Sequence, residues 1–172
     1  MLVYDLQNSQ DLEYDFNHIL SKLNELYYIE TDNGQFKVLS KLNDNSNTFW
    51  ASDENTVAFN VHIPTFKSLH KDMHSFIEAY AKQKFGKEHI KELEKQYINF
   101  KEFRLLNNLF KHFETREAEI SLTKIVHIGS STFDLICNYK YHDKIKSLNY
   151  SDFIILFLTI LKDFNIISLK GK

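Results

Sequence analysis

Residues 87–113 read KEHIKELEKQYINFKEFRLLNNLFKHF, a helical pattern that contains neither proline nor glycine. At about 100° per residue, Ile90, Leu93 and Tyr97 fall on one line along such a helix. Polar residues continue this line toward the C-terminal end, namely Arg104, Asn108, Lys111 and His112. Apolar residues occupy the other side of the second half: Phe103, Leu105, Leu106, Leu109, Phe110 and Phe113. We therefore predict one long helix that is packed on most sides and carries a polar stripe.

The polar stripe has two interpretations. Burying a polar group without a partner costs roughly 1–3 kcal/mol, so these side chains need polar partners, a ligand or a second copy of the chain. In the first, without a functional role, Arg104, Asn108 and His112 form a solvated stripe that ends at an exposed Lys111. In the functional interpretation they line a groove. The sequence leaves both open.

Composition predicts one globular domain spanning residues 1–172. The chain is 43% apolar and 26% charged, which is ordinary for a folded domain. Its one cysteine, Cys137, cannot form an intramolecular disulfide and fits a reducing compartment. The acidic start does not resemble a signal peptide, and the longest apolar run, 153–161, is too short to span a bilayer. We expect a cytoplasmic protein that makes no membrane contact.

The small net charge of −2 conceals an asymmetry between two parts of the chain. Residues 1–60 hold 10 acidic and 3 basic side chains, whereas residues 61–172 hold 13 acidic and 18 basic ones. The basic part is compatible with RNA as a partner, although its Lys and Arg are not clustered. The acidic part could also simply cover the basic part.

Sequence patterns before the long helix predict three helices and a hairpin. Apolar residues repeat at helical spacing over 8–27, and Asn33-Gly34 is typical of a tight turn between two short strands. Residues 40–55 are rich in Asn, Asp and Ser and favour irregular structure, followed by a short helix from Ser52 to Asn60. A second long helix should run from about residue 64 to Phe85 and end at Gly86.

Beyond Phe113 the pattern changes to alternation. It predicts a β-hairpin over 117–141 that turns at 129–131 and contains Cys137 as a small strand hydrophobe, followed by a buried C-terminal helix over 153–164. The expected fold is mainly α: a helical bundle around a long antiparallel helix pair, with one or two small β-hairpins. The α+β character is minor.

A possible metal site lies on the second long helix. His70, His74 and Glu78 are spaced four apart, which can place three ligands on one face. No HExxH motif accompanies them, and we favour the alternative that they form a solvated flank of an amphipathic helix. We expect no metal ion and no cofactor.

The string FRLLNNLFKHF places Asn108 three residues before Lys111-His112, and a β-hairpin and a C-terminal helix follow. Over roughly residues 64–165 this arrangement resembles uncharacterised bacterial helical proteins with an N-x-x-K-H helix. More distantly it is similar to the HEPN superfamily of helical bundles, so residues 61–172 would form a HEPN-like helical core. Many HEPN proteins are dimeric, metal-independent ribonucleases whose motif is an Arg, four to six residues and a His. Here seven residues separate Arg104 from His112, and Asn107 stands at the shorter spacing.

The resemblance implies an RNA-binding or RNA-cleaving protein of a bacterial toxin or phage-defence type. His112 would move the proton, Arg104 and Lys111 would stabilise the phosphorane charge, and Asn107 and Asn108 would contact or orient the substrate. A homodimer through the helix face at residues 90–112 would assemble a composite site. The alternative is a non-catalytic helical binding protein, acting as an antitoxin, immunity or adaptor partner of another protein.

Overall fold

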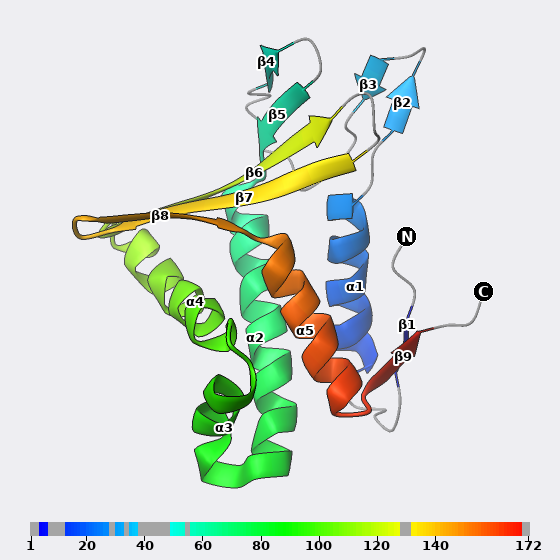
Figure 1. Ribbon diagram of the computed structural model, residues 1–172, viewed down its shortest axis with the longest axis vertical. Coiled ribbons are helices and arrows are strands. Elements are labelled where there is room, and N and C mark those ends of the chain that lie inside the picture. The colour runs from blue at the N-terminus through cyan, green and yellow to red at the C-terminus, as the bar shows by residue number, and fades with distance from the viewer. Residues whose placement is uncertain are drawn as a thin grey trace.

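The computed structural model describes residues 4–6, 13–27, 30–32, 35–37, 49–53, 56–127 and 132–169 of the chain. In these residues the helices lie on one side of an antiparallel sheet (Figure 1). The helices are α1 (Glu13–Tyr27), α2 (Ile63–Phe85), the 3₁₀ turn η1 (Gly86–Glu88), α3 (His89–Gln96), α4 (Phe100–Glu114) and α5 (Ser151–Asp163). The strands are β1 (Tyr4–Leu6), β2 (Glu30–Asp32), β3 (Gln35–Lys37), β4 (Phe49–Asp53), β5 (Thr56–Asn60), β6 (Ala118–His127), β7 (Thr132–Tyr141), β8 (Lys144–Asn149) and β9 (Ile167–Leu169). The prediction of a mainly helical fold with a smaller antiparallel β component is confirmed.

The main sheet has the strand order β4-β5-β6-β7-β8. β6 and β7 form its long central hairpin, which pairs from Ala118↔Tyr141 to His127↔Thr132. Alternate residues of β6 are buried, and these are Ala118, Ile120, Leu122, Lys124 and Val126. One sheet face therefore packs on the helices while the other, with Glu119 and Ser121, is more open. The hairpin predicted over 117–141 is confirmed, and β8 extends it by a strand that was not predicted.

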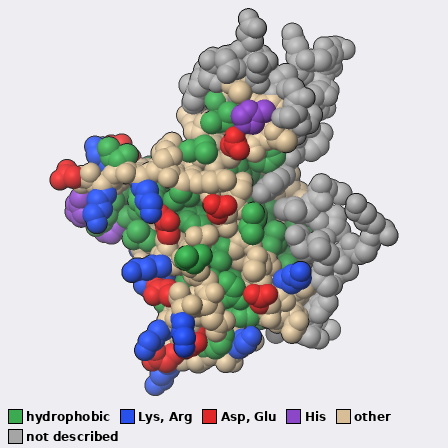
Figure 2. Space-filling view, viewed as in Figure 1, with side chains coloured by type: hydrophobic (Ala, Val, Ile, Leu, Met, Phe, Trp, Pro, Cys, Tyr) green, Lys and Arg blue, Asp and Glu red, His purple; other side chains and the backbone are tan. Residues whose placement is uncertain are grey.

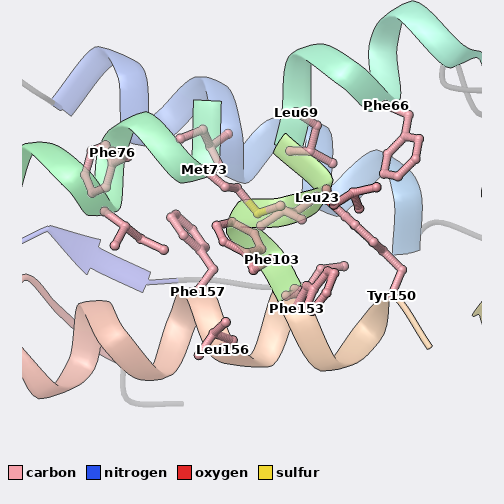
Figure 3. Packing of buried hydrophobic residues seen from close by; sticks show 14 of the residues in the cluster. Leu23, Phe66, Leu69, Met73, Phe76, Phe103, Tyr150, Phe153, Leu156 and Phe157 are labelled. Atoms are coloured by element: carbon pink, nitrogen blue, oxygen red, sulfur yellow. The ribbon is translucent and has the colours of Figure 1, made fainter. Parts of the chain in front are cut away.

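The helical layer forms the core under the sheet. α2 and α5 start beside the sheet and run away from it, and α4 returns toward it (Figure 1). Aromatic side chains from three helices meet between them, where Phe103 of α4 lies against Phe153 of α5 with ring centroids 5.5 Å apart (Figure 3). Within the described residues no helix has both the length and the apolar character that crossing a bilayer requires.

The predicted unbroken helix over 87–113 is wrong. α3 ends at Gln96, Tyr97 adopts an extended conformation (φ −124°, ψ 110°), and α4 starts at Phe100. The Tyr97 hydroxyl donates to Asp163 Oδ2 at 2.8 Å, which ties the break to the end of α5. Hydrophobic periodicity could not reveal the break, because the short turn leaves both Leu93 and Phe100 completely buried. A long antiparallel helix pair is consequently not confirmed.

The short helix predicted from Ser52 to Asn60 is also wrong. These residues contribute to β4 and β5, and β5 pairs with β6 from Thr56↔His127 to Asn60↔Thr123. Pairing with a neighbouring strand overrides the weak local preference of a short segment. The early hairpin is present as the antiparallel pair β2 and β3, while its Asn33–Gly34 turn lies outside the described residues. The predicted irregular segment at 40–55 also lies largely outside them.

The other predicted helices are confirmed with small shifts. α1 covers Glu13–Tyr27 of the predicted 8–27, and residues 8–12 lie outside the described residues; α2 runs to Phe85, and α5 starts at Ser151. Gly86 follows α2 with a φ of 65° and a ψ of −138°, a conformation that is open to glycine but strained for a residue with a Cβ.

Candidate functional site

Helix α4 carries all five residues that the sequence singled out. Arg104 is held toward α3, because its Nη2 and Nε atoms each lie 3.1 Å from Glu94 Oε1. Asn107 is half-buried, and its Oδ1 has no hydrogen-bond partner within the described residues. Asn108 and Lys111 are exposed to solvent. The stripe is therefore partly engaged and partly solvated.

His112 is held on another flank of the same helix, toward the sheet. Its Nδ1 lies 2.8 Å from Glu117 Oε2, and its Nε2 lies 3.5 Å from the Tyr141 hydroxyl. The end of α4 creates this contact, because the Glu117 amide donates to the His112 carbonyl at 2.8 Å and folds the chain back. The imidazole ring also packs on the Tyr141 ring, with centroids 4.7 Å apart.

This contact has a chemical consequence for His112. A carboxylate only accepts hydrogen bonds, so the proton of a neutral imidazole sits on Nδ1, and Nε2 is an acceptor whose lone pair faces the Tyr141 hydroxyl at 3.5 Å. With 39% of its side chain exposed, His112 can reach a ligand in solvent. The arrangement is suited to accepting and returning a proton.

The structure does not bring Arg104 and His112 together within one copy. Eight positions on a helix correspond to about 12 Å along its axis. Their partners also lie on different elements, Glu94 on α3 and Tyr141 on β7. The apolar line of Ile90, Leu93 and Tyr97 was expected to pack against a second copy of the chain. Part of it is already covered within one copy, because Leu93 is completely buried there.

Arg104 lies close enough to His74 of α2 for its charge to act on that ring. The His74 ring stacks on Phe100 and Phe103 with centroids 6.1 and 5.9 Å apart. Burial lowers the pKa of His74, Glu78 at 3.7 Å opposes this, and the charges of Arg104 and Lys111 lower the pKa further. His74 Nε2 is buried and has no partner among the described residues. Sequence spacing could not predict this meeting, because it joins separate helices.

A contact between His89 of α3 and Glu78 of α2 braces the same region. His89 Nδ1 lies 2.9 Å from the Gly86 carbonyl, and its Nε2 lies 3.2 Å from Glu78 Oε1. Two acceptors face one ring, so the contacts are satisfied together when His89 is protonated or when Glu78 carries the proton. The pair fixes the turn between α2 and α3.

The metal site considered on α2 is not formed. His70 is completely buried, with Nδ1 2.8 Å from the Tyr150 hydroxyl and Nε2 2.9 Å from the Phe103 carbonyl. The carbonyl requires a proton on Nε2, so the Tyr150 hydroxyl donates to Nδ1 and neither nitrogen remains for a metal. Burial lowers the pKa of His70 to about 3. Within the described ranges no group of three His, Cys, Asp or Glu side chains could hold a metal ion.

Cys137 is buried on the core side of β7. Burial raises the pKa of its thiol to about 12, so the nucleophilic thiolate is disfavoured. This agrees with its assignment as a small strand hydrophobe.

Residues that the sequence analysis missed complete the surroundings of His112. We call His112, Glu117, Tyr141 and His142 the tip site, because they lie where α4 ends beside the β7–β8 turn. Figure 2 shows His, Lys and acidic side chains gathered at this end of the molecule, on the left of the view. Glu117 follows His112 by five residues and could have been noticed, whereas Tyr141 reaches it only through strand pairing.

The chain matches no protein-family model, no curated protein and no solved structure.

Proposed function

We propose that this protein binds RNA and cleaves it without a metal ion, with His112 transferring the proton. The observation that carries the proposal is the 2.8 Å contact between His112 Nδ1 and Glu117 Oε2, which leaves Nε2 directed away from the carboxylate in a partly exposed ring. A base held by a second group within hydrogen-bond distance is the arrangement that proton transfer requires.

The reaction would follow from the RNA's own nucleophile. His112 Nε2 takes the proton of a 2′-hydroxyl, the 2′-oxygen attacks the adjacent phosphorus, and the bond from phosphorus to the 5′-oxygen breaks. The leaving oxygen takes a proton from the protonated ring or from water, and a 2′,3′-cyclic phosphate remains. Lys111 is exposed beside His112 and would balance the charge on phosphorus, and Asn108 would contact the phosphate from the preceding turn. Such a nuclease would suit a toxin or a phage-defence protein.

Arg104 enters this scheme only through a second copy. The Glu94 contact directs it away from His112 of its own chain, so a homodimer through the 90–112 helix face would have to supply it. The proposed dimer is therefore a separate claim from the proton transfer by His112.

A matched control for His112 exists in the same chain. His127 of β6 contacts Asp134 Oδ2 at 2.7 Å, and its side chain is 39% exposed, as is that of His112. Both histidines are thus surface rings paired with a carboxylate, but His127 lies at the other end of the β6–β7 hairpin.

The test measures cleavage of labelled RNA in EDTA by the wild type, His112→Ala, Glu117→Gln and His127→Ala. We expect His112→Ala to lower the rate by about 10²- to 10⁴-fold, the usual contribution of a general acid or base. Glu117→Gln should lower it less, and His127→Ala should leave it unchanged. Equal rates for His112→Ala and the wild type would remove His112 from the mechanism.

The separation of Arg104 from His112 favours a second candidate, a non-catalytic binding protein with RNA or a partner protein as its ligand. In that case the wild type cleaves no RNA in EDTA, and a pull-down from the native host retains a partner. Ile98, which is 94% exposed in the turn before α4, would then be a natural contact residue, and Ile98→Asp should reduce retention of that partner.

A further inference from the structure

Three rings form a row at the tip site. The His112 and Tyr141 centroids are 4.7 Å apart, and the Tyr141 and His142 centroids are 4.1 Å apart. The two ends of this row differ in their surroundings. His112 is half-buried beside Glu117, whereas His142 is exposed in the turn between β7 and β8. The row ends in a ring that solvent can reach.

The backbone keeps His142 at the outermost point of the hairpin. Tyr141 pairs with Lys144, so His142 and Asp143 form a two-residue turn. His142 has a φ of 54°, in the left-handed region where glycine is favoured and where asparagine, aspartate and histidine are the most common other residues. The turn therefore accommodates His142 and leaves its ring exposed at the tip of the hairpin.

Exposed cations flank the row. Lys144 is exposed in the strand that follows the turn, and Arg116 is exposed two residues before Ala118, the β6 residue that pairs with Tyr141. Asp143 is the acidic residue of the turn itself. Aromatic rings combined with nearby Lys and Arg are the features with which proteins bind unpaired nucleotides, because bases stack on the rings and phosphates meet the cations.

We propose that His142 is a stacking platform for an unpaired base, so that the substrate of the tip site is single-stranded RNA. This inference rests on the proposed function, since it takes RNA as the ligand. A base in a duplex already has neighbours on both faces, whereas an unpaired base has a face available for an exposed ring. A base stacked on His142 would be separated from His112 by the Tyr141 ring. A neighbouring phosphate of the same strand would then lie near His112 Nε2.

The test uses binding, which does not require cleavage. Fluorescence anisotropy measures the Kd of the full-length protein for a short single-stranded RNA with 2′-methoxy groups, which cannot be cut by its own 2′-oxygen. The variants are His142→Asn, which removes the ring but tolerates the positive φ, and His142→Tyr, which retains a ring. A matched oligonucleotide with 2-aminopurine at single positions reports stacking through quenching of its fluorescence.

We expect His142→Asn to weaken binding of the single-stranded RNA by about tenfold, within the range measured when a stacking aromatic is removed. His142→Tyr should bind within about twofold of the wild type, and both the wild type and His142→Tyr should quench 2-aminopurine at one position. Duplex RNA of the same sequence should bind equally to the wild type and to His142→Asn.

Two results would overturn the inference: equal Kd values of the wild type and His142→Asn for the single strand, or an equal loss of affinity for the duplex. The proposed nuclease function can fail independently of the stacking site. If the wild type does not cleave unmodified RNA but His142→Asn shows the selective loss, the stacking site stands and the nuclease does not. If cleavage depends on His112 but His142→Asn binds and cleaves as the wild type does, the nuclease stands and the stacking site does not.

Discussion

Acid should destabilise this protein through His70, and the effect can be calculated. The ring is completely buried between Tyr150 and the Phe103 carbonyl, and its pKa falls from 6.5 to about 3. In the unfolded chain His70 regains its ordinary pKa and binds a proton as the pH falls below 6.5, while the folded protein does not. The free energy of unfolding therefore keeps its full value above pH 6.5 and decreases as the pH falls from 6.5 toward 3.

The magnitude follows from this difference in proton binding. Each pH unit below 6.5 costs about 1.4 kcal/mol, so lowering the pH from 7.5 to 5 should reduce the free energy of unfolding by about 2 kcal/mol through His70 alone. His74 also has a lowered pKa and adds to the total acid sensitivity of the wild type. A comparison with a His70 variant isolates the contribution of one residue.

Urea denaturation of the wild type and His70→Gln at pH 7.5 and pH 5 measures the effect. Glutamine can still form hydrogen bonds but does not titrate, so the pH-dependent loss should be about 2 kcal/mol smaller in the variant. His127→Gln is the exposed control and should keep nearly the full loss. Equal losses in the wild type and His70→Gln would refute the reasoning, as would an NMR titration of the His70 ring with a midpoint above pH 5.

Other positions give independent predictions about the fold. Gly86→Ala should lower the free energy of unfolding by about 1–3 kcal/mol in chemical denaturation, because a residue with a Cβ is strained at a φ of 65° and a ψ of −138°, although the new Cβ would meet nothing within 4 Å. Lys124 is buried with Nζ 2.6 Å from the Leu26 carbonyl at the end of α1, and burial lowers its pKa to about 8. Its ammonium deprotonates first in the folded state, so stability should rise between pH 8 and pH 10 by at most about 3 kcal/mol, and Lys124→Met should abolish the rise in urea titrations. Tyr97→Phe should cost about 0.5–1.5 kcal/mol by removing the hydrogen bond to Asp163, and a thermal midpoint identical to that of the wild type would contradict this.

Hydrophobic periodicity correctly predicted those helices and strands whose conformation follows from the pattern of their own side chains. α2 was predictable from its apolar spacing and from Gly86, and the β6–β7 hairpin from alternation. The break at Tyr97 was not, because a three-residue turn preserves the apolar phase and the hydroxyl that stabilises it bonds to Asp163, which is 66 residues away. β5 likewise owes its strand conformation to pairing with β6, which lies far along the chain, and β4 pairs in turn with β5.

The same distinction applies to the candidate site. His112 could be singled out because it lies on a polar stripe of one helix, and Glu117 is close enough in sequence to have been found. Tyr141 and His142 join the site only through the pairing of β6 with β7. A helical wheel also placed Arg104 and His112 on one polar stripe, but it did not show that Glu94 and Glu117 hold them toward different elements.

The central claim is that His112 activates an RNA 2′-hydroxyl without a metal ion. The most direct measurement is the single-turnover cleavage rate of a single-stranded RNA in EDTA, beside the same oligonucleotide with one 2′-deoxy residue at the cleaved position. The wild type should cut only the RNA and leave a 2′,3′-cyclic phosphate, and His112→Ala should cut it at least about a hundredfold more slowly. Cleavage of the deoxy-substituted strand at the same position, or equal rates for the wild type and His112→Ala, would contradict the claim.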